Sequence, residues 1–340
     1  MIKRGILLFC AYLLILFLVV SDCSAIELMY RPTSKGEPTE VSFFIFLIDV
    51  DAISGAEQNF IANVALRLQW KDERLKKDAK GIRMIPLEEA WNPRILLANR
   101  QTLTRTSLPE VLEVEPDGTV NYRQRYVGPL SQPLRLSQFP FDRHNFKVQF
   151  VAIGFESDEL KLIPGKSDDY DFTGGVIAEH FSQPDWDIEK YTVNSRPYEP
   201  IKGVKLAGFD LEFTASRHPL YYVWQVIVPL VFIVVMSWGA FWIDPEHASA
   251  QIGVATSSML TLIAYRFMLG DLLPRLPYMT RMDYFTLAAT ALVFLAFVEV
   301  IATTILTYKK KGQLAKKVDV CARVIFPAIY ISWSTWALFL

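Results

Sequence analysis

The chain has 340 residues, with 35 Lys plus Arg against 36 Asp plus Glu and a formal net charge of −1 at pH 7. Hydrophobic residues make up 51% and charged residues 21%, and the mean hydropathy is +0.22. This composition excludes an intrinsically disordered chain, which needs low hydrophobicity and high net charge. The near-zero net charge excludes a bulk-basic nucleic-acid-binding protein.

The first apolar segment, residues 6–20, follows two basic residues and precedes small residues suited to cleavage. This order predicts a secretory signal peptide over residues 1–25, with the mature chain beginning near Ile26. An uncleaved membrane anchor is the alternative.

Residues 26–218 alternate short β-type segments with turn signals such as Pro-Asp-Gly at 116–118. They predict an all-β, immunoglobulin-like sandwich that is exported. Trp70 and Trp91 are expected to pack in its core, and no cysteine pair is present to brace it, since beyond the signal peptide only Cys321 remains. The clearest predicted strands are 41–50, 60–70, 145–153 and 209–215.

Residues 219–340 contain four long apolar segments and predict an all-α four-helix transmembrane domain, because each approaches the length that crosses a ~30 Å hydrocarbon core. The spans are expected at about 219–243, 248–268, 284–308 and 321–340. Five lysines lie between the third and fourth spans, and the positive-inside rule places this connection in the cytoplasm. The exported domain and the C-terminus are then both on the extracellular or periplasmic side of the plasma (inner) membrane.

The sequence carries no enzyme signature. The four histidines are scattered, no His/Cys spacing fits a metal site, and no glycine-rich loop follows a strand. We therefore expect neither covalent chemistry nor a cofactor or metal.

Five short motifs follow one another along the chain. They are W-K-D-E-R-L at 70–75; Trp91, Pro93 and Asn99; F-P-F-D at 139–142; Arg217, Tyr221, Tyr222 and Pro229; and Arg323, Phe326 and Pro327. Their order and spacing resemble those of pentameric ligand-gated ion channels over essentially the whole mature chain. Gln132 and Phe146 stand where the family has its signature disulfide, so the similarity is greatest to the prokaryotic members.

The resemblance implies a homopentamer whose pore is lined by the second membrane helix. That segment is rich in hydroxyl groups, and the residues matching the family's pore-facing positions are Gly253, Ser257, Leu260, Ala264 and Phe267. Their spacing of three and four residues puts them on one stripe of a helix. Leu260 and Phe267 would form apolar constrictions that gate by dewetting. The alternative is that this stripe packs against neighbouring helices.

Ion selectivity has two interpretations. Glu246 before the pore helix and Asp271 at its outer end would attract cations in a five-fold ring. Arg266 and the Ala-Ser-Ala sequence at 248–250 resemble features of anion-selective receptors. We favour monovalent cations, with an anion-selective channel as the alternative.

The family pattern also implies a coupling junction between the exported and membrane parts. It pairs Asp142 with Arg217, and a bidentate Arg–carboxylate pair gives geometric specificity. Phe141 lies at the base of the sandwich. Pro274 and Pro277 stiffen the connection between the second and third spans because each fixes φ.

Agonists of such channels bind between neighbouring extracellular domains, in aromatic cages that hold cations. The aromatic candidates are Phe155, Tyr191 and Tyr198, whereas Arg125 would suit an anionic ligand. Protons are a further candidate agonist. A membrane-anchored sensor that binds ligand without conducting ions is the alternative from another class of protein.

Overall fold

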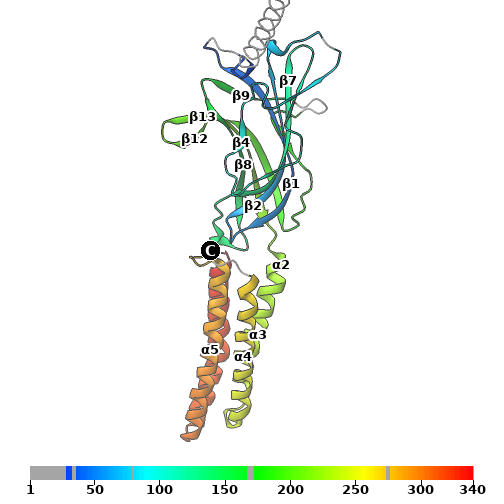
Figure 1. Cartoon of the computed structure of the whole chain (residues 1–340). Coiled ribbons are helices and arrows are strands. Elements are labelled where there is room, and N and C mark those ends of the chain that lie inside the picture. The colour runs from blue at the N-terminus through cyan, green and yellow to red at the C-terminus, as the bar shows by residue number, and fades with distance from the viewer. Residues whose placement is uncertain (1–27, 33–35, 79, 167–171, 273–275, 340) are drawn as a thin grey trace, which may run out of the picture.

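The computed structural model describes residues 28–32, 36–78, 80–166, 172–272 and 276–339. The predicted signal peptide lies outside these residues. A β-sandwich and a group of long helices are arranged end to end, and the C-terminus lies beside the end of the sandwich that meets the helices (Figure 1). The predicted fold class, an all-β sandwich followed by a helical part, agrees with this architecture.

The larger sheet has eight strands in the described part of the chain, with the order β10-β1-β2-β7-β6-β3. β5 pairs with β7, and β9 and β10 both pair with β1 in parallel. The strands are β1 (Thr39–Ser54), β2 (Asn59–Lys71), β3 (Arg83–Pro86), β5 (Arg105–Thr106), β6 (Val111–Val114), β7 (Thr119–Ser131), β9 (Leu160–Pro164) and β10 (Gly175–Ile177).

The second sheet has five strands among the described residues, with the order β11-β13-β8-β4 and with β12 paired to β13. The predicted strands at 41–50, 60–70, 145–153 and 209–215 are confirmed as parts of β1, β2, β8 and β13, each of which is longer than predicted. The predicted turn at 116–118 joins β6 to β7. The strands are β4 (Ile95–Leu97), β8 (Arg143–Glu156), β11 (Trp186–Ser195), β12 (Tyr198–Ile201) and β13 (Val204–Arg217).

Aromatic side chains fill the space between the two sheets. Phe43 of β1 stacks on Phe209 of β13 with ring centroids 4.1 Å apart. Phe60 of β2 meets Phe146 of β8 edge to face at 5.2 Å, and Phe146 stacks on Phe213 at 5.1 Å. Phe146, which stands where the family has a cysteine, is fully buried. Aromatic packing of this kind stabilises beyond the area that it buries, so this sandwich is held by its core.

The two tryptophans of the motifs are core residues, as predicted. Trp70 is 3% and Trp91 4% exposed. Their rings meet edge to face at 5.6 Å. Trp91 thereby connects the segment before β4 to strand β2.

The membrane part consists of long helices. Three of them in the described chain, Leu220–Trp242, Pro245–Gly270 and Arg281–Tyr308, are long and apolar enough to cross a membrane. The first of these helices, Leu220–Trp242, has no break, but its turns are irregular: it contains a π-turn and ends in a 3-10 turn. The elements are α2 (Leu220–Tyr222), a π-turn η3 (Val223–Ile227), α3 (Val228–Trp238), η4 (Gly239–Trp242), η5 (Pro245–His247), α4 (Ala248–Leu272), α5 (Arg281–Tyr308) and α6 (Gly312–Phe339).

The C-terminal helix α6 begins at Gly312, earlier than the predicted span at 321–340. Its first turns carry Lys316, Lys317 and Asp319, so hydropathy alone did not include them, although Lys, Leu and Ala favour helix. Tyr330 of α6 packs against Trp238 of α3 at 5.8 Å and against α5. At the same end of α5, its first residue Arg281 donates to the main-chain oxygen of Leu338, near the end of α6, at 3.1 Å. A fourth helix is therefore present, antiparallel to α5.

The irregularity of the first membrane helix has a local cause. Pro229 has no N–H, so the carbonyl of Gln225 four residues earlier loses its helical partner. The hydroxyl of Tyr265 on α4 donates to this carbonyl and to that of Val226, both at 3.0 Å. The proline thus creates an acceptor through which the first helix is joined to the second.

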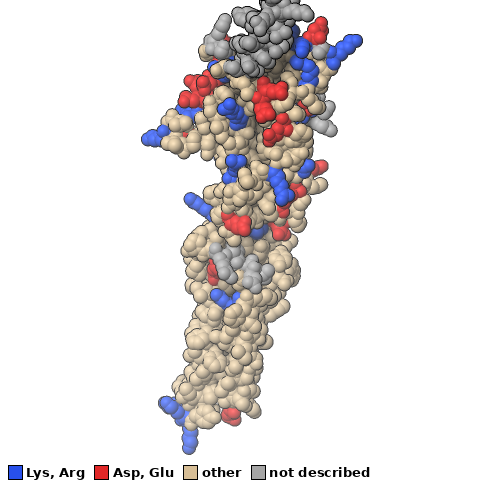
Figure 2. Space-filling model, in the orientation of Figure 1, with Lys and Arg blue, Asp and Glu red and all other residues tan. Residues whose placement is uncertain are grey.

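Charged side chains are distributed unevenly along the molecule. On the face drawn in Figure 2, they gather over the sandwich and at the far end of the helices, with a long region between that is almost free of them. We call that far end, which holds the α5–α6 connection, the inner end. A charge-free band between charged ends is what a helical group embedded in a bilayer presents.

Candidate functional site

The base of the sandwich holds a buried ion pair. Arg217 at the end of β13 donates from Nε to Oδ1 of Asp142 at 2.9 Å and from Nη2 to Oδ2 at 3.2 Å. The main-chain N–H of Arg217 also donates to the carbonyl of Asp142 at 3.1 Å. Asp142 is 2% exposed. The predicted pair therefore forms in bidentate geometry, although 75 positions separate its members in the sequence.

Four further side chains surround this pair. Nε2 of His144 lies 2.9 Å from Oδ2 of Asp142. The Arg217 guanidinium lies 4.4 Å from the ring centroid of Trp186, 5.1 Å from Phe139 and 6.0 Å from Tyr222. Aromatic faces attract a cation, more strongly when it is desolvated. The charge of Arg217 is therefore balanced by a carboxylate and by rings from three different segments.

The carboxyl group of Asp142 is held ionised. Burial opposes ionisation, but the hydrogen bonds from His144 and Arg217, together with the positive charge of Arg217, outweigh it and lower the pKa of Asp142 below 3.8. The pair therefore persists at neutral and mildly acidic pH.

The same loop also contacts the membrane part. The main-chain N–H of Leu136, in the short helix η2 (Leu136–Gln138), donates to the hydroxyl of Tyr278 at 3.0 Å, and that hydroxyl lies 3.4 Å from the carbonyl of Leu134. The N–H of Met282 donates to the carbonyl of Phe139 at 3.3 Å. The segment that holds Asp142 therefore rests directly on the α4–α5 connection.

The other predicted coupling residues lie around this contact. Phe141 is half-buried beside Asp142, and Pro277 is exposed next to Tyr278. Pro274 lies outside the described residues. Asp49, in the second half of β1, accepts hydrogen bonds from the main chain and side chain of Ser182, in the connection between β10 and β11.

Tyr278→Phe tests the contact between the two parts. The substitution keeps the ring and removes only the hydroxyl, which leaves the N–H of Leu136 without its partner. Such a loss costs about 1 kcal/mol, which corresponds to about a fivefold weakening of the coupling. We expect agonist sensitivity to fall by this order in concentration–response recordings, with unchanged assembly.

Tyr221→Phe is the matched control. Tyr221 lies at the same junction, half-exposed, with its ring edge to face on Tyr222. Phenylalanine retains that contact, so sensitivity should stay at the wild-type value. Equal responses from both variants and the wild type would contradict a coupling role for the Tyr278 hydroxyl.

Helix α4 has two different faces. Gln251, Ala255, Ser258, Leu262 and Leu269 are buried against the rest of the chain. At 3.6 residues per turn, the five residues of the predicted pore stripe point to the opposite side. All five are exposed, with Leu260 at 62% and Phe267 at 79%; they are Gly253, Ser257, Leu260, Ala264 and Phe267.

The charges at the two ends of α4 have specific neighbours. Glu246 is 75% exposed, and Nζ of Lys316 lies 3.9 Å from its carboxylate and 2.9 Å from that of Asp244. Arg266 donates to the hydroxyl of Thr290 on α5 at 3.3 Å. Asp271 lies in the last turn of α4, and its side chain lies outside the described residues. Before the first turn of α4, the carboxylates of Asp244 and Glu246 thus share one lysine, Lys316.

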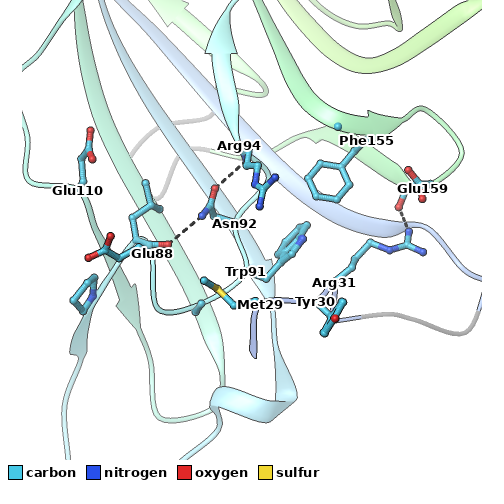
Figure 3. A pocket seen from close by; sticks show the side chains of 14 residues that line it. Met29, Tyr30, Arg31, Glu88, Trp91, Asn92, Arg94, Glu110, Phe155 and Glu159 are labelled. Carbon is cyan, nitrogen blue, oxygen red and sulfur yellow. Dashed lines mark hydrogen bonds between the residues drawn. The ribbon is translucent and has the colours of Figure 1, made fainter. Parts of the chain in front are cut away.

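A cavity of about 750 Å³ opens on the sandwich at the end away from the helices. Figure 3 shows Trp91 and Phe155 side by side in its wall, with ring centroids 5.7 Å apart. Glu88 and Glu110 lie on one side of the rings. The cavity is also lined by the charged side chains of Arg31, Arg94 and Glu159. Arg31 donates a hydrogen bond to the main-chain oxygen of Glu159. Rings and charges of both signs suit a small polar or charged molecule.

The four ligand candidates are not brought together within one chain. Phe155 on β8 lines the cavity, and Tyr191 on β11 and Tyr198 on β12 are partly buried in the same second sheet. Arg125 on β7 of the larger sheet donates to Oδ1 of Asn63 at 2.9 Å. A single binding site containing all four would need residues from two subunits.

Three residues of the junction were missed from the sequence. His144 follows Asp142 by two positions on β8, Trp186 begins β11, and Tyr278 ends the proline-containing connection. The tyrosine directly after Pro277 was a usable signal, because a proline fixes φ and so restricts the direction of the chain that carries the next side chain. No local pattern marks Trp186 as a neighbour of Arg217.

The fold and the junction define a membrane channel of the ligand-gated class: a β-sandwich with a buried ion pair at its base, in contact with helices that can span a bilayer. Residues 26–219 match the model of the neurotransmitter-gated ion-channel ligand binding domain, and residues 226–329 match that of the neurotransmitter-gated ion-channel transmembrane region. The chain therefore belongs to the pentameric, Cys-loop family of ligand-gated ion channels, which are not enzymes.

Two kinds of relative illustrate the range of this family. The chain is 28% identical over 310 residues to the proton-gated ion channel of Gloeobacter violaceus, covering 88% of this chain and 82% of that protein. It is also 28% identical over 300 residues to the glycine receptor subunit beta of Rattus norvegicus and of Homo sapiens. That match covers 84% of this chain and 59% of each receptor subunit.

Proposed function

We propose that five copies of this chain form a channel whose pore is lined by α4 and which passes monovalent cations. The observation that carries this proposal is the exposed stripe on α4, which lies opposite the face buried against the chain's own helices. In a five-fold ring, Gly253 and Ser257 would line the inner half of the pore. Leu260 and Phe267 would form apolar rings that close it to water.

The proposed orientation follows from charge and from helix order. The inner end carries the lysines of the α5–α6 connection and would lie in the cytoplasm. The sandwich and the C-terminus lie together at the opposite end (Figure 1). They would both be on the extracellular or periplasmic side of the plasma (inner) membrane.

The agonist in this proposal is a small molecule or a proton that acts on the sandwich between neighbouring subunits. The separation of Phe155, Tyr191 and Tyr198 from Arg125 within one chain supports a site shared by two subunits. One relative is named as a proton-gated ion channel and another as a glycine receptor subunit. Acid pH steps and glycine are therefore the first agonists to test.

The test is single-channel recording from the purified full chain in liposomes. Unitary currents that appear on an acid step or with glycine, and that reverse near the Na⁺ equilibrium potential in a NaCl gradient, are the expected result. Binding of a ligand without any current would favour the non-conducting sensor. Reversal near the Cl⁻ equilibrium potential would favour an anion channel.

Glu246→Gln tests the source of selectivity. Five copies of Glu246 near the inner mouth would concentrate cations there, and Lys316 neutralises only part of this charge because Asp244 holds it more closely. We expect a several-fold loss of preference for Na⁺ over Cl⁻, measured as a shift of the reversal potential toward zero in a NaCl gradient.

Glu199→Gln makes the same chemical change far from the pore. Glu199 lies in β12 of the sandwich and accepts a hydrogen bond from Gly203 that Gln retains. Its reversal potential should equal that of the wild type. An unchanged potential in Glu246→Gln would remove this residue from the selectivity mechanism.

A further inference from the structure

A group of buried acids lies behind the inner end of α4, outside the coupling junction and the pore stripe. Glu299 belongs to α5 and Asp319 to α6, and their carboxyl groups face each other within hydrogen-bonding range. Asp319 is 1% exposed, and both carboxyl oxygens of Glu299 are shielded from solvent. Two acids thus meet where water does not reach them.

The hydrogen bonds around these groups are incomplete. Oδ1 of Asp319 and both carboxyl oxygens of Glu299 have no partner that donates a hydrogen. Oδ2 of Asp319 lies 3.4 Å from Nε2 of Gln251, a fully buried residue of α4. A buried oxygen without a donor costs about 1 to 3 kcal/mol, so this arrangement requires a further hydrogen.

Gln251 cannot supply that hydrogen by turning its amide group. Its Nε2 donates to the carbonyl of Ala240 at 3.2 Å and to that of Ile243 at 2.9 Å. The nitrogen is therefore fixed on the side of these carbonyls, and Oε1 is left as another buried acceptor without a donor. Every unmatched atom of the group is an oxygen.

The nearby charges do not replace a donor. Arg323 of α6 attracts Asp319 at a distance, but its Nε donates to the carbonyl of Phe241 at 2.9 Å and its guanidinium lies over the ring of Trp242. Lys316 is engaged by Asp244, whose negative charge opposes that of Asp319. Neither Glu299 nor Asp319 has a salt-bridge partner in the described part of the chain.

We propose that Glu299 and Asp319 together bind one proton, which is held between their carboxyl groups and joins the inner ends of α5 and α6 behind α4. Two carboxylates in contact in a buried site cannot both be ionised, and the pair titrates as a unit. A metal ion is the weaker occupant, because only two carboxylates meet here and the described residues contain no group of three metal-ligating side chains.

The proton-binding pair adjoins the proposed pore. Gln251 precedes Gly253, the innermost residue of the stripe, by two positions, and it connects α4 to Asp319. Removing the proton would leave two negative charges in contact and push α5 and α6 apart at the point where they support α4. This consequence for conduction rests on the proposed function, whereas the presence of the proton does not.

Infrared spectroscopy of the purified channel in lipid tests the proposal directly. We expect the C=O stretch of a protonated carboxyl group near neutral pH, and its loss in both Glu299→Gln and Asp319→Asn. Glu246→Gln, a change of an exposed acid at the same end, should retain it. Absence of this band from the wild type, as expected for a pair held ionised by a metal cation, or its survival in both variants would overturn the proposal.

Thermal unfolding at increasing pH gives a second measurement. The folded chain binds one proton more than the unfolded chain, so the stability of the fold decreases as pH rises. While the pair still holds its proton, the folding equilibrium constant falls by up to about tenfold per pH unit. Glu299→Gln supplies a permanent donor in place of the proton. Its melting temperature should therefore fall less than that of the wild type, and an equal fall in both proteins would count against the proton.

Discussion

Asp142→Asn is expected to reduce the ligand-evoked current by more than about tenfold while leaving the pentamer assembled. The amide keeps the shape of the carboxylate but removes its charge, so the buried guanidinium of Arg217 loses its counter-ion. Breaking a buried pair in this way costs about 3 kcal/mol. The loss falls on the loop that also contacts Tyr278 and Met282. The sandwich would then transmit less of its displacement to the α4–α5 connection.

The measurement combines recording in liposomes, with acid pH steps and glycine as probes, and size-exclusion chromatography with light scattering for assembly. The pKa of Asp142 lies below 3.8, so its contribution is complete above that pH and is lost only as pH falls through the lowered value. Mild acid steps therefore leave the wild-type pair intact. Wild-type currents from Asp142→Asn would contradict a coupling role.

Asp117→Asn is the control for the same chemical change. Asp117 forms an exposed pair with Lys71 at 2.7 Å, and its Oδ1 accepts a hydrogen bond from the main-chain N–H of Thr119 that an asparagine oxygen also accepts. Exposed ion pairs contribute little. We expect wild-type currents and assembly from this variant, which separates the effect of burial from that of the substitution.

Leu260→Ser is expected to open the channel without ligand. In the proposed pore, a ring of five leucines would stabilise the closed state by excluding water, and each serine would forfeit about 1 kcal/mol of apolar contact. Together, five copies raise the ratio of open to closed channels by at least about a hundredfold. Spontaneous unitary currents in ligand-free liposomes are the measurement. A variant as silent as the wild type would remove Leu260 as the gate.

Leu295→Ser separates the gate from a general loss of apolar surface. Leu295 on α5 is 49% exposed, close to the 62% of Leu260, but it does not belong to the α4 stripe. This variant should show no spontaneous opening. Equal spontaneous activity in both variants would mean that helix packing, and not a pore ring, determines the closed state.

Helix α4 shows which features of a membrane helix can be predicted from the sequence and which cannot. Its length and its abundance of hydroxyl and amide groups mark it as different from the other spans, and its period defines a stripe. By polarity alone, Gln251, Ser257 and Ser258 are alike, and only the period and the family match place Ser257 on the stripe. Packing separates them, because Gln251 and Ser258 are buried against the chain's own helices while Ser257 is exposed.

Glu299 and Asp319 in the membrane part likewise show what the sequence indicates and what only packing decides. In the sequence, Glu299 is only an interruption of an apolar span and Asp319 only a residue of a basic connection. Neither position indicates the other, because 20 residues and a change of chain direction separate them. Their contact depends on α5 and α6 packing side by side.

The sequence by itself determined the order of the parts whose average is the mean hydropathy of +0.22. An intermediate hydropathy resolves into a polar sandwich and apolar helices because strand alternation and apolar length are local properties of the chain. Family motifs added the Asp142–Arg217 pair, whose contact the structure contains, and the proposed pore stripe. Only the tertiary structure decided which rings surround Arg217, which face of α4 is exposed and which acids meet. These depend on packing between segments far apart in the sequence, which no local pattern encodes.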